Sequence, residues 1–138
     1  APGEASIRDT PNLAMLILKA RLFRLTKDEV FRIEARALNG VLESVPLALL
    51  SSRADRAFGL TLLFEITGEQ RFIDAADAAF DAAAALRGPW CSPVTTRCTT
   101  GLVHDQTSGV LASSLCAGCT FRMLWSLGYR RALAGSPY

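Results

Sequence analysis

The sequence has few of the side chains on which most catalytic and metal sites depend. It contains one histidine, His104, and after Asp81 only one acidic residue, Asp105. Charge is scarce overall, since Asp, Glu, Lys and Arg make up 20% of the 138 residues and the net charge is +2. Aromatic residues do not alternate with basic ones, as they do in proteins that bind single-stranded nucleic acid. We therefore expect no nucleic-acid partner.

Long uninterrupted hydrophobic runs are also absent. The longest apolar stretch, NLAMLILKARLF, is broken at Lys19 and Arg21, whereas a membrane-spanning helix needs about 20 apolar residues. We expect no membrane span. Hydrophobic residues still make up 50% of the chain, which is enough for the core of one domain, residues 1–138. The start APGEAS lacks a Met, which indicates that a signal peptide, a longer N-terminal region or a tag was removed.

What the sequence does contain is a succession of helix patterns. A helix is expected from Thr10-Pro11, because Thr can cap a helix and Pro fits its first position. The next helix follows Thr26 directly, so the two form an antiparallel hairpin over about residues 10–40. Further helix patterns predict a second hairpin over about residues 46–87.

An internal repeat links the two hairpins. LFRLTKDEVFRIEARAL and LFEITGEQRFIDAADAAF align with Thr26 over Thr67 and Phe31 over Phe72, a constant spacing of 41 residues. Repeats of this length are typical of stacked helical units. A weaker third copy of the turn lies in RRALAGSPY at the end of the chain. The sequence therefore predicts an all-α fold of helical hairpins in tandem.

Three aspartates recur along the helix of the second hairpin, at positions 74, 77 and 81. Carboxylates at this spacing share one face of a helix and are able, in principle, to bind a metal. The opposite face is rich in alanine and phenylalanine, the pattern of an amphipathic helix. We interpret the three as the solvated face of that helix.

A long polar connection follows, over about residues 88–118, and the last helix is expected at about residues 119–134. Connections of this length in compact helical domains are usually functional or cross-linked. The connection contains His104 and Asp105, which are neighbours in sequence, and neighbouring side chains usually diverge. We therefore expect His104 to be a polar loop residue rather than part of a catalytic relay.

All four cysteines of the chain fall late in the sequence, and their spacings are C-x6-C and C-x2-C. Disulfides are the first interpretation, and they favour a secreted or periplasmic chain. The second is a zinc site of four cysteines, or of three cysteines and His104. The third is a redox-active CAGC motif at a helix start. Zinc is thus the only cofactor under consideration, and the cysteines concerned are Cys91, Cys98, Cys116 and Cys119.

The repeat resembles the hairpins of (α/α)6 toroids, the six-hairpin glycosidases, whose turns read L-[YF]-x-x-T-G-[DE]-x-x-[YF]. LLFEITGEQRFIDAADAAF is similar to that pattern throughout, and the first repeat has Lys27 in place of Gly. TGLVHDQTSG and CTFRMLWSLGYRRALAGSPY resemble glycoside hydrolase family 76, in which Thr120 and Phe121 match a Thr-Tyr pair. The Asn-Gln that follows is replaced by Arg122 and Met123, and the family's aspartate pair has no counterpart.

The resemblance implies an incomplete or diverged carbohydrate-active toroid that acts on or binds α-mannan-like polysaccharide. It implies substrate contacts at His104, Asp105, Thr120 and Phe121, and it leaves open whether the chain is an enzyme. The alternative is a noncatalytic helical-repeat interaction module with a loop stapled by disulfides or zinc. A complete toroid has about twice as many helices, so a hairpin flank is exposed here. We expect that flank to bind another protein chain, and we predict a homodimer.

Overall fold

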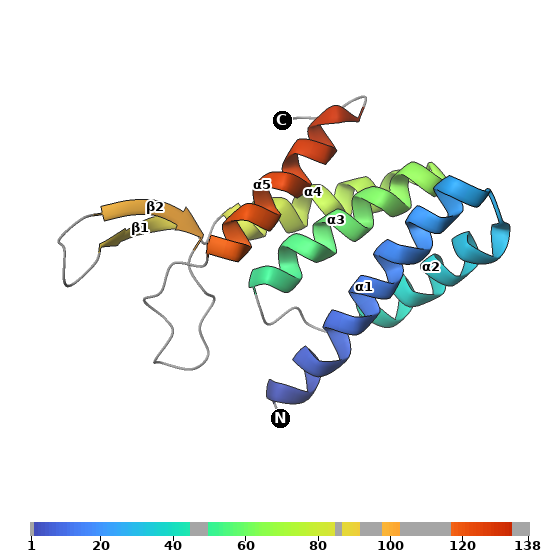
Figure 1. The fold of residues 1–138 in the computed structure, drawn as a ribbon. Helices are drawn as coiled ribbons and strands as arrows, with labels where there is room; N and C mark the ends of the chain where they lie inside the picture. Colours follow the sequence, from blue (N-terminus) through green and yellow to red (C-terminus); the bar gives the residue numbers. More distant parts are fainter. Residues whose placement is uncertain (1, 45–49, 85–86, 92–97, 103–116, 134–138) are drawn as a thin grey trace.

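The computed structural model describes residues 2–44, 50–84, 87–91, 98–102 and 117–133 (Figure 1). The all-α class and the hairpins in tandem are confirmed. The elements are the helices α1 (Pro2–Thr26), α2 (Glu29–Glu43), α3 (Leu50–Thr67), α4 (Gln70–Ala84) and α5 (Ala117–Ala132), with the strands β1 (Arg87–Cys91) and β2 (Cys98–Leu102).

Three of the helices lie in a row. Helix α3 packs against α1 on one side and α5 on the other, while α2 pairs with α1 and α4 pairs with α3 (Figure 1). All residues from Arg56 to Leu63 of α3 are buried, because neighbours cover this helix on several sides. We call α1, α3 and α5 the inner helices and α2 and α4 the outer helices.

The outer helices are amphipathic. Helix α2 buries Ala35, Asn39 and Leu42, which recur at intervals of three and four residues. Helix α4 does the same with a stripe that includes Phe72 and Phe80. One face of each outer helix therefore completes the core and the other faces solvent.

The aspartates of α4 divide between two roles. Asp74 and Asp81 are exposed, as expected for a solvated face. Asp77 is half-buried, and its two carboxylate oxygens accept hydrogen bonds from Nε and Nη2 of Arg130 at 2.9 and 3.0 Å. Arg130 is only 3% exposed. This bidentate ion pair fastens α5 to α4, a role that the sequence interpretation did not include.

The 41-residue repeat is visible in the hydrogen bonds of the two hairpin turns. The Thr26 hydroxyl donates to the carbonyl of Leu22 at 2.8 Å, and the Thr67 hydroxyl donates to the carbonyl of Leu63 at 2.7 Å. Each hydroxyl also accepts a bond from the backbone N–H two residues later, at 3.2 Å in both turns. The two turns are therefore copies of one structure.

The residue after each threonine has a left-handed backbone. Its φ is 60° at Lys27 and 72° at Gly68. Glycine adopts this conformation readily, whereas a side chain there costs about 1–2 kcal/mol. The first turn thus retains the geometry of the second although Lys replaces Gly.

Two boundaries differ from the sequence prediction. Helix α1 begins at Pro2, and Pro11 lies inside it, whereas the sequence predicts a start at Thr10. Residues 2–9 hold only one glycine and no further proline after Pro2, so the helix continues past the point that Pro11 marks. The sequence also predicts only a loop after α4, whereas β1 and β2 form an antiparallel pair there, from Arg87 opposite Leu102 to Cys91 opposite Cys98.

Sequence patterns do not predict these strands because RGPWC and CTTGL carry glycine and proline, which weaken strands.

In the part of the chain that the structure describes, none of the helices has the length and hydrophobicity of a membrane span.

Candidate functional site

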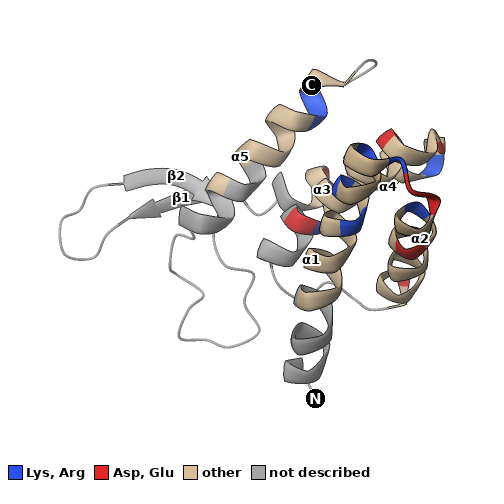
Figure 2. Cartoon of the chain, turned by 45° about the vertical axis from the view of Figure 1, so that its right-hand side comes forward, with Lys and Arg blue, Asp and Glu red and all other residues tan. Residues whose placement is uncertain are grey.

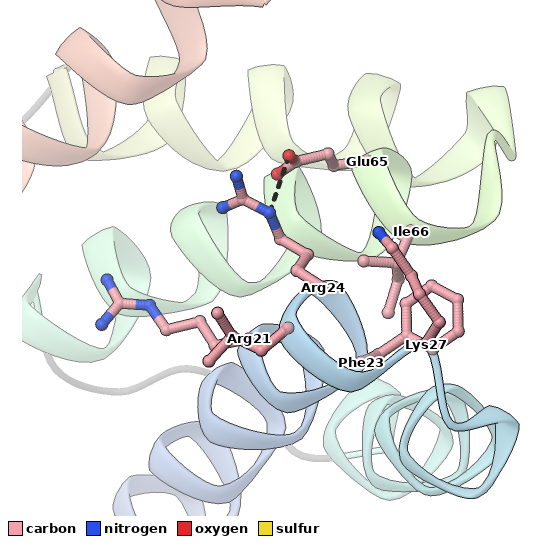
Figure 3. Close-up of a pocket in the computed structure, with 7 residues that line it drawn as sticks. Arg21, Phe23, Arg24, Lys27, Glu65 and Ile66 are labelled. Atoms are coloured by element: carbon pink, nitrogen blue, oxygen red, sulfur yellow. Dashed lines mark ion pairs between the residues drawn. The ribbon is translucent and has the colours of Figure 1, made fainter.

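A cleft of about 610 Å³ opens where α1 and α3 end, beside the first hairpin turn (Figure 3). The inner helix α3 contributes Glu65 and Ile66 to it. The end of α1 and the residue that follows contribute Arg21, Phe23, Arg24, Leu25 and Lys27. The described residues that line this cleft are thus three basic, three apolar and one acidic.

One polar network connects all three inner helices beside the cleft. Nε of Arg24 lies 3.0 Å from Oε1 of Glu65 (Figure 3). Nη1 of Arg24 donates to the Tyr129 hydroxyl at 2.6 Å, and that hydroxyl donates to Oε2 of Glu65. The three residues come from α1, α3 and α5 respectively, so the network fixes the ends of the row relative to one another.

Tyr129 is a proton donor in this network over the whole neutral range. Its pKa is raised from 10.0 to about 12, chiefly by burial and also by the hydrogen bond to Glu65 and the negative charge of that carboxylate. A phenolate beside a carboxylate would be repelled, so the protonated phenol is favoured. Tyr129 is therefore a structural donor and not an acid or base near pH 7.

The described residues that line the cleft do not include the pair of groups that glycoside hydrolysis uses. That reaction requires two carboxylates on opposite sides of the sugar. Glu65 is the one carboxylate among the described lining residues, and both of its oxygens are engaged by Arg24 and Tyr129. The arrangement can bind a polar or anionic group, but its described residues offer no acid and base pair.

Sequence reasoning did not identify this network. A pattern was available, since Arg24 and Glu65 are 41 residues apart and occupy the same position in the two repeats. Tyr129 had no such indication, because the spacing of the last helix from α3 is not 41 residues.

Two of the four residues predicted as substrate contacts, Thr120 and Phe121, lie in the described part of the chain. Phe121 lies on α5 and is 70% exposed, and Thr120 precedes it in the same helix. His104 and Asp105 lie outside the described residues, so their predicted role remains a prediction.

The predicted cysteine cluster is described in part. The backbones of Cys91 and Cys98 lie opposite each other in the sheet, and Cys119 lies in the first turn of α5. Cys116 lies outside the described residues. Over the part of the chain that the structure describes, no group of three or more His, Cys, Asp or Glu is placed to hold a metal ion.

A second surface is formed by the open face of α1, the side of that helix turned away from α3. Met15 is 43% exposed, Leu18 48% and Leu25 81%, and Leu22 between them is half-buried. These residues recur at intervals of three and four and include no charge, and residues 11–18 are entirely uncharged in Figure 2. The open face of α1 is therefore an apolar stripe.

An apolar groove of about 410 Å³ runs beside this stripe, between α1 and α2. Ala37, Leu38 and Val41 of α2 line it together with Met15. An ion pair crosses it, from Nζ of Lys19 to Oε2 of Glu34 at 2.6 Å. The groove extends the apolar surface from α1 onto α2, in agreement with the exposed hairpin flank that the sequence predicts.

The repeat shows what kind of neighbour fits the open face. The counterpart of Leu18 is Gly59, 41 residues later, and Gly59 is buried against Leu16 of α1. The counterpart of Leu25 is Ile66, which is 7% exposed instead of 81%. The face of α3 that corresponds to the open face of α1 is therefore buried against α1. By analogy, the neighbour that fits the open face of α1 is another helix.

Comparison with protein-family models found no match to this chain. Comparisons with curated proteins and with solved structures found no match either.

Proposed function

We propose that the chain is a noncatalytic helical-repeat interaction module, and that two copies associate through the open face of α1. One observation carries the proposal: α1 is apolar on two sides, and the described part of the chain covers one of them. Soluble proteins rarely leave a contiguous apolar stripe exposed unless it is an interaction surface.

The apolar character of the two kinds of helix supports this function. The outer helices α2 and α4 each carry one apolar face, as surface helices do. Helix α3 is buried throughout residues 56–63, and α1 carries apolar side chains on its open face as well as on its buried face, a pattern that suits helices with neighbours on several sides. For α3 those neighbours are present. For α1 the second neighbour is supplied by the other copy.

A second copy is the favoured occupant because the stripe is self-complementary. It carries no charge, so two stripes face each other without repulsion, and twofold dimers that use the same patch twice are the commonest oligomers. Complete burial of a Leu or Met side chain contributes about 1.5–3 kcal/mol. Met15, Leu18 and Leu25 together therefore supply a substantial driving force.

Sedimentation equilibrium at micromolar concentration tests the proposal. The wild-type chain is expected to be a dimer, and Leu18→Glu, which places a charge in the centre of the stripe, is expected to be a monomer. Ile33→Glu is the matched control, because Ile33 is 63% exposed on α2 and its counterpart Asp74 already carries an exposed carboxylate. A monomeric wild type, or a control that dissociates as readily as Leu18→Glu, contradicts the proposal.

A carbohydrate-binding role is the second candidate, and exposed aromatic side chains on α5 favour it. Phe121 is 70% exposed and Trp125 is 51% exposed, and flat apolar rings of this kind stack on the apolar faces of sugar rings. The resemblance to six-hairpin glycosidases points to α-mannan-like polysaccharide. Calorimetric titration with α-mannan is expected to show binding that Phe121→Ala removes and Leu124→Ala retains. If Phe121→Ala and Leu124→Ala bind α-mannan equally well, Phe121 does not support a carbohydrate-binding role.

A further inference from the structure

The register of the β-hairpin places two of the four cysteines opposite each other. Strand β1 ends at Cys91, β2 begins at Cys98, and the antiparallel register pairs these two residues directly. They form the last pair of the ladder, where β1 ends and β2 begins. Four cysteines can form disulfides in three different pairings, and the register favours the one that joins Cys91 to Cys98.

The backbone geometry at this pair suits a covalent bond. Residues directly opposite each other in an antiparallel pair have Cα atoms about 4.5–5.5 Å apart. A disulfide requires Cα atoms about 4.4–6.8 Å apart. The Cα separation expected for Cys91 and Cys98 therefore lies within the range of a disulfide.

The hairpin also needs reinforcement. An isolated two-stranded sheet is marginally stable at best. Here β1 contains Pro89, which has no N–H for the ladder, and each strand contains a glycine, which weakens strand pairing. A cross-link at this last pair of the ladder would hold a register that the backbone hydrogen bonds hold only weakly.

The position of α5 separates these two cysteines from Cys119. Strand β2 runs toward the start of α5, so Cys98 lies at its far end and Leu102 at the near end (Figure 1). A strand of this length spans about 13 Å at about 3.3 Å per residue. Cys119 lies in the first turn of α5. Zinc holds its sulfur ligands at about 2.3 Å, and the separation of Cys98 from Cys119 does not favour a site that contains both.

We propose that Cys91 and Cys98 form a disulfide that locks the β-hairpin. In this reaction each thiol loses a proton, the two sulfurs together give up two electrons, and the S–S bond forms. An oxidising disulfide of the oxidised-glutathione class accepts the electrons and protons and leaves as two thiols. The proposal is independent of the proposed function, because it concerns the hairpin and not the open face of α1.

Peptide mapping of the full chain tests the bond. The protein is treated with oxidised glutathione, free thiols are alkylated, and the non-reduced chain is digested with trypsin and with a protease that cleaves before aspartate. Cleavage after Arg87, Arg97 and Arg122 and before Asp105 places Cys91 in peptide 88–97 and Cys98 in peptide 98–104. Cys116 and Cys119 remain together in peptide 105–122.

The expected product is peptide 88–97 linked to peptide 98–104, with a mass two hydrogens below the sum of the separate peptides. Cys98→Ser is expected to abolish this product, whereas Cys116→Ser is expected to retain it. A link from peptide 88–97 to peptide 105–122, or alkylated Cys91 and Cys98 after oxidation, would overturn the proposal. So would native mass spectra of the freshly purified chain that show one bound zinc, lost only when both cysteine pairs are removed.

Discussion

Lys27 is held in a left-handed conformation by the turn that surrounds it, with φ at 60°. Its counterpart Gly68 adopts the same conformation without a side chain. We expect Lys27→Gly to raise the free energy of unfolding by about 1 kcal/mol, because it removes the conformational cost of the side chain. Urea denaturation measures this change. The reverse substitution, Gly68→Ala, is expected to lower stability by a similar amount, and a stabilising Gly68→Ala would contradict the interpretation of both turns.

Tyr129 gives the chain a specific dependence on pH. Its folded pKa, about 12, lies above the ordinary value of 10.0, so the folded state holds the phenolic proton more tightly. Its contribution to stability is complete below pH 10 and is lost as the pH rises from 10 to 12. We expect Tyr129→Phe to be less stable than wild type at pH 9, by about 1 kcal/mol for the lost hydrogen bonds. The difference should shrink at pH 11, and a constant difference would argue against this titration.

Gly59 of α3 lies at a close contact between α1 and α3. A Cβ atom added to Gly59 would lie 2.9 Å from Cδ2 of Leu16, which is completely buried. Gly59→Val is therefore expected to destabilise the fold by about 1–3 kcal/mol through overpacking. Gly128 of α5 has no atom within 4 Å of such a Cβ. Gly128→Ala should thus stabilise the chain by up to about 1 kcal/mol, and thermal unfolding compares the two variants.

The helices and their turns could be predicted because their determinants are local. Thr26 and Thr67 close their turns through bonds within four residues, and the 41-residue spacing makes both recognisable in the sequence. The β-hairpin and the early start of α1 could not be predicted this way. Gly and Pro in the strands, and Pro11 within the helix, are locally unfavourable, and only the surrounding structure makes them acceptable.

The candidate site was less predictable than the fold for the same reason. The open face of α1 follows from the apolar pattern, and the exposed flank was expected. The Arg24–Glu65–Tyr129 network joins residues as far as 105 positions apart, and no local pattern specifies the last of them. Long-range polar contacts of this kind depend on how the helices pack, which sequence periodicity alone does not determine.

At the scale of the whole molecule, both ends of the row of inner helices expose apolar side chains. Leu124 of α5 is 64% exposed, comparable to the residues of the open face of α1. Association through one patch used twice predicts that Leu124→Glu remains a dimer in sedimentation equilibrium, in contrast to Leu18→Glu. If Leu124→Glu is monomeric and an equal mixture of the two variants forms dimers, the copies associate head to tail instead.

The ion pair between Arg24 and Glu65 depends on a sequence difference between the two repeats. Because the two residues occupy the same position, identical copies of the repeat would place either two arginines or two glutamates next to each other. The attraction exists only because the copies have diverged. A regular array built from one consensus repeat would meet like charges at every such junction, so this chain gains its contact from asymmetry, and the order of its hairpins matters.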